Sequence, residues 1–113
     1  MASATPLPDV LPDTNTDTES KTHRQPPYAV ILYNDDINGM DFVISVLRKV
    51  FGYTVEKCVD LMLVAHKTGR AVVWVGALEV AELKADQIRS CGPDPDQKSK
   101  GAQPLGVSVE PAA

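Results

Sequence analysis

The chain has 113 residues, 43% of them apolar and 23% charged, which is enough for one compact domain and too little for two independent cores. Eleven Lys and Arg stand against fifteen Asp and Glu, and the formal net charge of -4 argues against binding to a phosphate backbone. Two widely spaced cysteines argue against a disulfide scaffold or a zinc finger, so we expect a protein of the reducing cytosol. No apolar run reaches the roughly 20 residues of a membrane-spanning helix.

The N-terminal stretch, residues 1–27, predicts a flexible extension. It holds five prolines and no aromatic residue, so it cannot bury enough surface to offset the ordering of its backbone. It is also acidic, unlike an organelle transit peptide. Residues 28–33 then form an unbroken apolar and aromatic run that predicts a strand, and Asn34-Asp35-Asp36 predicts the turn that ends it.

Two amphipathic helices are expected next. Apolar residues from Met40 to Phe51 recur at helical spacing, with Asn38 as a candidate N-cap and Gly52 in the place of a left-handed C-terminal residue. Thr54 is expected to cap a second helix through His66, whose broad apolar surface predicts deep burial.

The second half of the chain predicts a strand, a helix and a last strand. Residues 70–75 are short and rich in β-branched side chains, which favours a largely buried strand. Residues 79–89 read as a helix with Ala77, Val80, Ala81, Ala85 and Ile88 on its inner side. A polar stretch follows, of which residues 92–101 are expected to form a mobile surface loop, and the alternation around residues 105–109 favours a half-buried strand. The expected domain, residues 28–110 with a tail at 111–113, is a two-layer β-α-α-β-α-β fold of the α+β class.

The polar residues at the end of the first strand carry the only combination that suggests chemistry. Asn34 and Asp35 beside the helix-end His66 offer a carboxylate, an amide and a neutral imidazole, which can surround a small cation with hydrogen-bond acceptors. Taken singly, the triplet is usually a simple turn, and a histidine at this place usually only favours the helix C-terminus. Met40 and Met62 are ordinary core residues in one interpretation and the walls of an adaptable apolar pocket in the other.

Five motifs in order resemble the ClpS family, the adaptors of the Clp protease. They are Tyr33-Asn-Asp-Asp36, Met40-Asp-Phe-Val43, Leu61-Met-Leu-Val-Ala-His66, Gly76-Ala-Leu-Glu-Val-Ala-Glu-Leu-Lys84 and Gln103-Pro-Leu105. The resemblance covers most of residues 26–110. It implies a three-stranded antiparallel sheet and a non-enzymatic, monomeric, cytoplasmic adaptor without cofactor or metal, bacterial in origin in preference to plastid. Such an adaptor binds proteins that begin with Leu, Phe, Tyr or Trp and delivers them to a ClpA- or ClpC-type AAA+ unfoldase.

The resemblance also assigns roles to residues. Asn34, Asp35 and His66 would hold the free α-amino group of the substrate, and Met40 would exclude β-branched side chains. Glu79 and Lys84 would dock on the N-terminal domain of the unfoldase, and residues 1–27 would engage the unfoldase during delivery. The hydrophobic pocket would be formed by Asp36, Asn38, Met40, Val43, Met62, Ala65 and Leu105.

Three features depart from the family pattern. Asn38-Gly39 replaces the frequent Thr-Pro before Met40, and glycine leaves the backbone freer than proline would. Ala65 is smaller than the usual branched residue, which is expected to deepen the pocket and favour aromatic side chains over Leu. The link at residues 92–101 is longer and more polar than usual.

Two alternatives use the same sequence. One is a small protein-interaction domain of this topology without an amine site, like the C-terminal domain of the ribosomal stalk protein. The other is a small hydrolase that uses Asp35 and His66, although the chain offers no clearly activated nucleophile and no specific metal-ligand spacing.

Overall fold

The computed structural model describes residues 26–112. Most of the predicted extension and the last residue of the predicted tail lie outside the described residues. The described elements follow the predicted order of strands and helices. They are β2 (Tyr28–Tyr33), α2 (Met40–Phe51), α3 (Val55–Thr68), β3 (Arg70–Gly76), α4 (Leu78–Ser90), the short 3-10 helix η1 (Pro95–Lys100) and β4 (Val107–Pro111).

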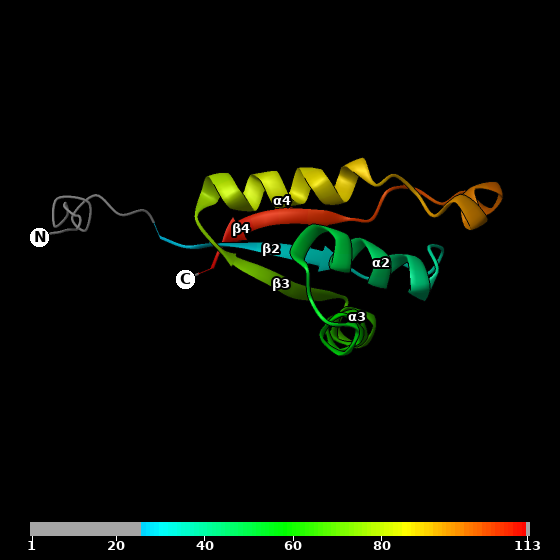
Figure 1. Cartoon of the computed structure of the whole chain (residues 1–113), viewed down its shortest axis with the longest axis horizontal. Coiled ribbons are helices and arrows are strands. Elements are labelled where there is room, and N and C mark those ends of the chain that lie inside the picture. The colour runs from blue at the N-terminus through cyan, green and yellow to red at the C-terminus, as the bar shows by residue number, and fades with distance from the viewer. Residues whose placement is uncertain (1–25, 113) are drawn as a thin grey trace, which may run out of the picture.

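The three described strands form one antiparallel sheet in the order β3-β2-β4, which confirms the predicted fold class (Figure 1). Tyr28 pairs with Gly76 on one side and with Pro111 on the other. Because β2 is central, both of its edges are bonded and its four middle residues are buried. The turn that follows β2 is therefore attached to the most firmly held strand of the sheet.

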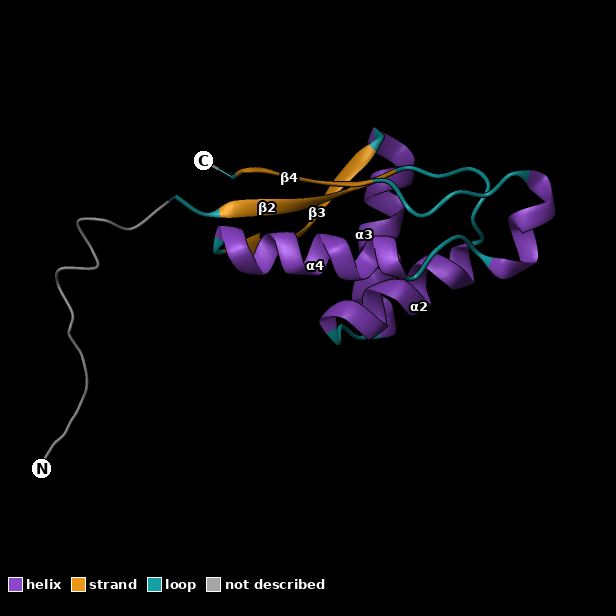
Figure 2. Ribbon diagram, turned by 90° about the horizontal axis from the view of Figure 1, so that it is seen from above, coloured by secondary structure: helices purple, strands orange, loops and turns teal. Residues whose placement is uncertain are grey.

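The core lies between the sheet and the helices. Figure 2 shows α4 and α2 on the same side of the sheet. Val30 and Leu32 point from β2 into the core and are almost completely buried. Burying apolar surface is the main driving force of this packing. The buried cluster consists of Val30, Leu32, Val43, Val46, Leu47, Val50, Cys58, Met62, Val73, Ala81, Ile88 and Leu105.

The ends of α2 and α3 follow the sequence signals with one exception. Gly52 adopts φ 75° and its N–H donates to the Arg48 carbonyl, and the Thr54 side chain accepts from the Lys57 N–H, as predicted. The predicted N-cap role of Asn38 is wrong. Gly39 is the N-cap residue of α2, with no side-chain cap bond, because the Asn38 side chain bonds to other partners.

The burial predicted for three elements is also wrong. β3 lies at the edge of the sheet and its residues alternate between exposed and buried, with Val72 and Val75 each 50% exposed, so the strand is not largely buried. α3 buries only Cys58, Met62 and Ala65. Its other apolar residues are half-buried or exposed: Val55, Val59, Leu61, Leu63 and Val64. Val80 on α4 and its N-cap residue Ala77 are exposed, although they were expected on the inner side.

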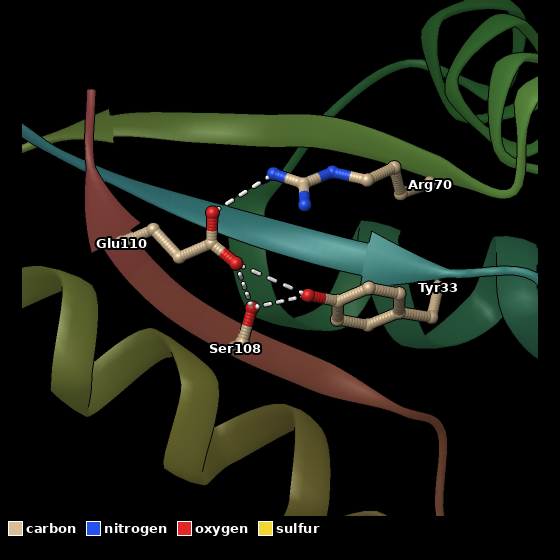
Figure 3. A network of polar contacts seen from close by, with 4 residues as sticks. All are labelled: Tyr33, Arg70, Ser108 and Glu110. Atoms are coloured by element: carbon tan, nitrogen blue, oxygen red, sulfur yellow. Dashed lines mark hydrogen bonds and ion pairs between the residues drawn. The ribbon is translucent and has the colours of Figure 1, made fainter. Parts of the chain in front are cut away.

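A polar network crosses the outer face of the sheet and joins all three strands (Figure 3). The Arg70 guanidinium donates to Glu110 at 2.9 Å, and the Tyr33 hydroxyl lies 2.9 Å from Ser108 Oγ and 3.2 Å from the Glu110 carboxylate. The hydrogen bond from Arg70 holds the pKa of Glu110 below its ordinary value. An exposed pair of this kind contributes little to stability, so its main effect is to favour one register of the strands.

The segment after α4 is ordered by contacts at both ends, so its description as a mobile loop is wrong. The Asp94 carboxylate accepts from the Asp96 N–H and caps η1, and the Gly101 N–H bonds back to the end of η1. Asp94 and Ala102 are buried on either side of this helix. The segment therefore forms a fixed wall beside the N-terminus of α2. None of the helices described in residues 26–112 is long and apolar enough to cross a bilayer.

Candidate functional site

The Asp35 carboxylate is the centre of the turn after β2. Its Oδ1 accepts from the backbone N–H groups of Ile37 and Asn38 at 2.8 and 2.9 Å, and its Oδ2 accepts from the Asn38 side-chain amide at 2.6 Å. Oδ1 thus has two donors, whereas Oδ2 has one described donor. Because a carboxylate oxygen accepts about two hydrogen bonds, Oδ2 can take one more donor from a ligand.

These hydrogen bonds keep Asp35 negatively charged. Partial burial by itself would raise the pKa of Asp35, but the N–H groups of Asn38 and Ile37 and the Asn38 side chain outweigh it and lower the pKa below its ordinary value. The turn therefore presents a fixed negative charge at the end of β2.

A hollow of about 400 Å³ lies between this turn and the C-terminal end of α3. Small-molecule pockets begin at about 300 Å³, so the volume suits one side chain with its attached amino group. α3 contributes Met62 and His66, which are one helical turn apart and share a face. The lining residues are Asp35, Asp36, Ile37, Asn38, Gly39, Met40, Met62, Leu63, His66 and Gln97.

The structure thus brings six of the ten predicted binding residues to one hollow: Asp35, Asp36, Asn38, Met40, Met62 and His66. Asn34 does not line it, and its side-chain amide donates to Asp36 at 3.2 Å. Val43, Ala65 and Leu105 do not line it either, and all three are buried in the domain.

Sequence analysis did not find four of the lining residues: Ile37, Gly39, Leu63 and Gln97. Ile37 could have been inferred, since it lies inside the turn and is apolar. Gln97 could not, because it reaches the hollow from η1 through the tertiary structure. Met40 is 62% exposed and Ile37 44% exposed at the rim, which is unfavourable for large apolar side chains unless a partner covers them.

The two residues predicted to dock on an unfoldase lie on α4, away from the residues that line the hollow. Glu79 is exposed in the first turn of α4. Lys84 is half-buried, donates from Nζ to the Val50 carbonyl at 2.9 Å and lies 5.8 Å from the centre of the Phe51 ring. Lys84 therefore holds the C-terminal end of α2 against α4, in addition to any role it has in docking.

The remaining chemistry of the described residues is limited. Cys58 and Cys91 are free thiols, and burial raises the pKa of Cys58 above its ordinary value, so its thiol stays protonated at neutral pH. Within residues 26–112, no three His, Cys, Asp or Glu side chains come together in a way that could hold a metal ion.

Comparison with known proteins gives consistent results. Residues 23–107 match the family model of the ATP-dependent Clp protease adaptor protein ClpS. The ATP-dependent Clp protease adapter protein ClpS from Ruegeria is 45% identical to this chain, and the match covers 84% of this chain and 79% of that one. The protein of the same name from Roseobacter denitrificans is also 45% identical, and the match covers 65% of each chain. The match thus spans just under two thirds of the Roseobacter protein.

A solved structure gives the same result. The structure of Agrobacterium tumefaciens ClpS2 bound to L-phenylalaninamide superposes with a TM-score of 0.67 at 36% identity, and the match covers 78% of this chain and 99% of that one.

Proposed function

Because the chain belongs to the ClpS family of Clp protease adaptors, we propose that its hollow binds the free α-amino group and the bulky first side chain of proteins that begin with Leu, Phe, Tyr or Trp. ClpS proteins are adaptors and not enzymes, which separates this chain from the hydrolase alternative. The observation that carries the proposal is the ionised Asp35, with an oxygen that can accept another bond, beside His66 and two methionines in one hollow.

The α-ammonium group would be held by acceptors around the rim. It offers three donors, and its pKa of about 7.7 to 8.0 keeps it largely charged at neutral pH. Asp35 Oδ2 and an imidazole nitrogen of His66 are proposed as two of the acceptors. The side-chain carbonyl oxygen of Asn34 is proposed as the third acceptor, while its NH₂ group donates to Asp36.

The first side chain would enter the hollow between Met40 and Met62, with Val43, Ala65 and Leu105 behind it. L-phenylalaninamide, the ligand named for the Agrobacterium structure, combines a free α-amine with an aromatic side chain, and we extend this recognition to the present chain. We expect Phe and Trp to bind more tightly than Leu, because Ala65 is small. A peptide series in which Leu binds best would contradict this expectation.

The expected binding free energies require that the amino group and the first side chain bind together. Burying a Leu or Phe side chain contributes about 1.5 to 3 kcal/mol, and each charged hydrogen bond contributes about 1.5 to 3 kcal/mol. Micromolar affinity needs about 8 kcal/mol after the cost of association, so neither part reaches it alone.

The test is the affinity of a Phe-initiated peptide measured by fluorescence anisotropy, with its Nα-acetylated form as the matched control. Acetylation removes the charge and leaves Asp35 facing an amide, so it should abolish binding. Equal affinities for the two peptides would refute the proposed function.

Delivery to a ClpA- or ClpC-type unfoldase is the second part of the proposal. Glu79 and Lys84 on α4 are proposed to contact its N-terminal domain, with residues 1–27 engaging it during hand-over. Glu79 is exposed, which suits such a contact, whereas Lys84 already bonds to Val50. Exchanging Glu79 for Lys should weaken binding of the unfoldase and leave peptide affinity unchanged.

We further propose that the adaptor works as a cytoplasmic monomer. Its two cysteines are free thiols, which agrees with a reducing compartment.

A further inference from the structure

The two buried polar side chains of residues 26–112, Asn38 and Asp94, join the segment after α4 to the start of α2. Asn38 is 6% exposed and Asp94 is 8% exposed. The Asp94 N–H donates to Asn38 Oδ1 at 2.8 Å, and the Gly39 N–H donates to Asp94 Oδ2 at 3.1 Å. A buried polar group without partners is costly, so these reciprocal bonds hold the segment after α4 against the start of α2.

The same contacts continue to the proposed amine site. The Asn38 side-chain NH₂ group donates both to Asp35 Oδ2 at 2.6 Å and to the Gln103 carbonyl at 2.8 Å. Both N–H bonds and the oxygen of this amide are therefore used, which fixes its orientation. The backbone N–H of Asp94 is thus connected to Asp35 through the Asn38 side chain, whereas the Asp94 carboxylate bonds to Gly39.

Gly39 is the second link. Its φ of -71° lies where a proline ring would hold it, yet as glycine it keeps the N–H that bonds to Asp94. A Cβ atom on Gly39 would lie 3.0 Å from Asp94 Oδ2, so the close approach of the carboxylate depends on the missing side chain. The bond to Asp94 restrains the peptide just before Met40, as a proline ring would. The Asn38-Gly39 pair and the long segment at 92–101 are therefore one connected feature.

We propose that Asp94 is a positioning residue of the substrate site: its carboxylate holds the Gly39 N–H and so the backbone that presents Met40, while its own backbone N–H orients the Asn38 amide that bonds to Asp35. It touches no substrate atom itself. This inference depends on the proposed function, because the quantity it controls is the binding of a free amino group and the choice between first side chains.

The experiment compares Asp94→Ala with Asp96→Ala, which removes an exposed carboxylate from the same helix η1 and causes the same change in charge. Affinities for Phe-initiated and Ile-initiated peptides are measured by anisotropy, and folding is checked by thermal unfolding. Asp94→Ala loses the carboxylate that accepts from the Gly39 N–H and keeps the backbone bond to Asn38, so Phe binding should weaken by about tenfold, the effect of one lost hydrogen bond to a charged group. It should also reduce the preference for Phe over Ile, whereas Asp96→Ala should stay within about twofold of the wild type for both.

A rescue variant separates positioning from a general loss of structure. In Asp94→Ala/Gly39→Pro, the ring supplies the restraint that the lost bond supplied, and the observed φ is compatible with proline. Most of the Phe preference should return. Should Asp94→Ala fail to fold, Gly39→Ala tests the same contact, because its methyl group would lie 3.0 Å from Asp94 Oδ2 and would force the carboxylate to shift away from the Gly39 N–H. Gly39→Ala should also lower the preference for Phe.

Three outcomes would overturn the inference: unchanged peptide binding in a folded Asp94→Ala variant, a folded double variant no better than the single one, or an unchanged Phe preference in Gly39→Ala. These outcomes differ from failure of the proposed function, in which the wild-type chain itself does not bind the Phe-initiated peptide.

Discussion

Replacing Asp35 by Asn tests the central claim, because the two side chains have the same shape and differ in charge and in one acceptor. The amide oxygen can keep the bonds from the Ile37 and Asn38 backbone N–H groups. Its NH₂ group then faces the Asn38 side-chain NH₂ group, at a position where the two heavy atoms are now 2.6 Å apart. Two donors cannot bond to each other, so one charged hydrogen bond is lost and the turn must open.

The expected effects follow from that loss. The free energy of unfolding should fall by about 1.5 to 3 kcal/mol, and the dissociation constant of a Phe-initiated peptide should rise by about 10- to 150-fold because the ammonium also loses its carboxylate. Asp60→Asn, an exposed change of the same kind on α3, should alter both by less than about 0.5 kcal/mol.

The pH dependence of stability gives an independent check. Hydrogen bonds hold the pKa of Asp35 below its ordinary value of 3.8, so their stabilisation is complete above that pH and is lost as the pH falls through the folded-state pKa. The difference in urea unfolding between wild type and Asp35→Asn should therefore be full at pH 7 and shrink below pH 3.8. A folded Asp35→Asn variant that binds the peptide within about twofold of the wild type would refute the assignment of Asp35.

Three further predictions concern other parts of the molecule. A variant that begins at Gln25 should bind peptides with unchanged affinity and fail to accelerate their degradation by the unfoldase, and undiminished degradation would contradict the role given to the N-terminal segment. Peptide affinity should fall by about tenfold for each pH unit above about 8, because only the charged α-amine binds; a flat profile up to pH 10, with the fold intact by circular dichroism, would exclude that charge from recognition. Thr54→Ala should lower the free energy of unfolding by about 1 kcal/mol in urea melts, through loss of the bond to the Lys57 N–H, and should leave peptide affinity unchanged.

Local patterns predicted the elements well because each signal is satisfied within a few residues. The Thr54 cap and the left-handed Gly52 depend on bonds to residues three or four positions away. The burial of β3 could not be predicted in this way, since its place at the edge of the sheet depends on which strands pair. The central strand β2, in contrast, buries its four middle residues.

In the candidate site, too, residues with local signals were predicted and residues placed by distant contacts were not. Asp35 and His66 stood out because a polar turn and a helix end are visible in the sequence, and both line the hollow. Asn38 was given the wrong structural role because its competing partners, Asp94 and Gln103, are more than 50 positions away. Gln97 was missed for the same reason.

The bond from Asn38 to the Gln103 carbonyl has a consequence for the newly made protein. A chain still being translated cannot complete this contact until the ribosome has passed residue 103, and the segment that contains Asp94 must also have left the exit tunnel. The proposed site for free amino groups is therefore unfinished until the segment through Gln103 has emerged from the ribosome.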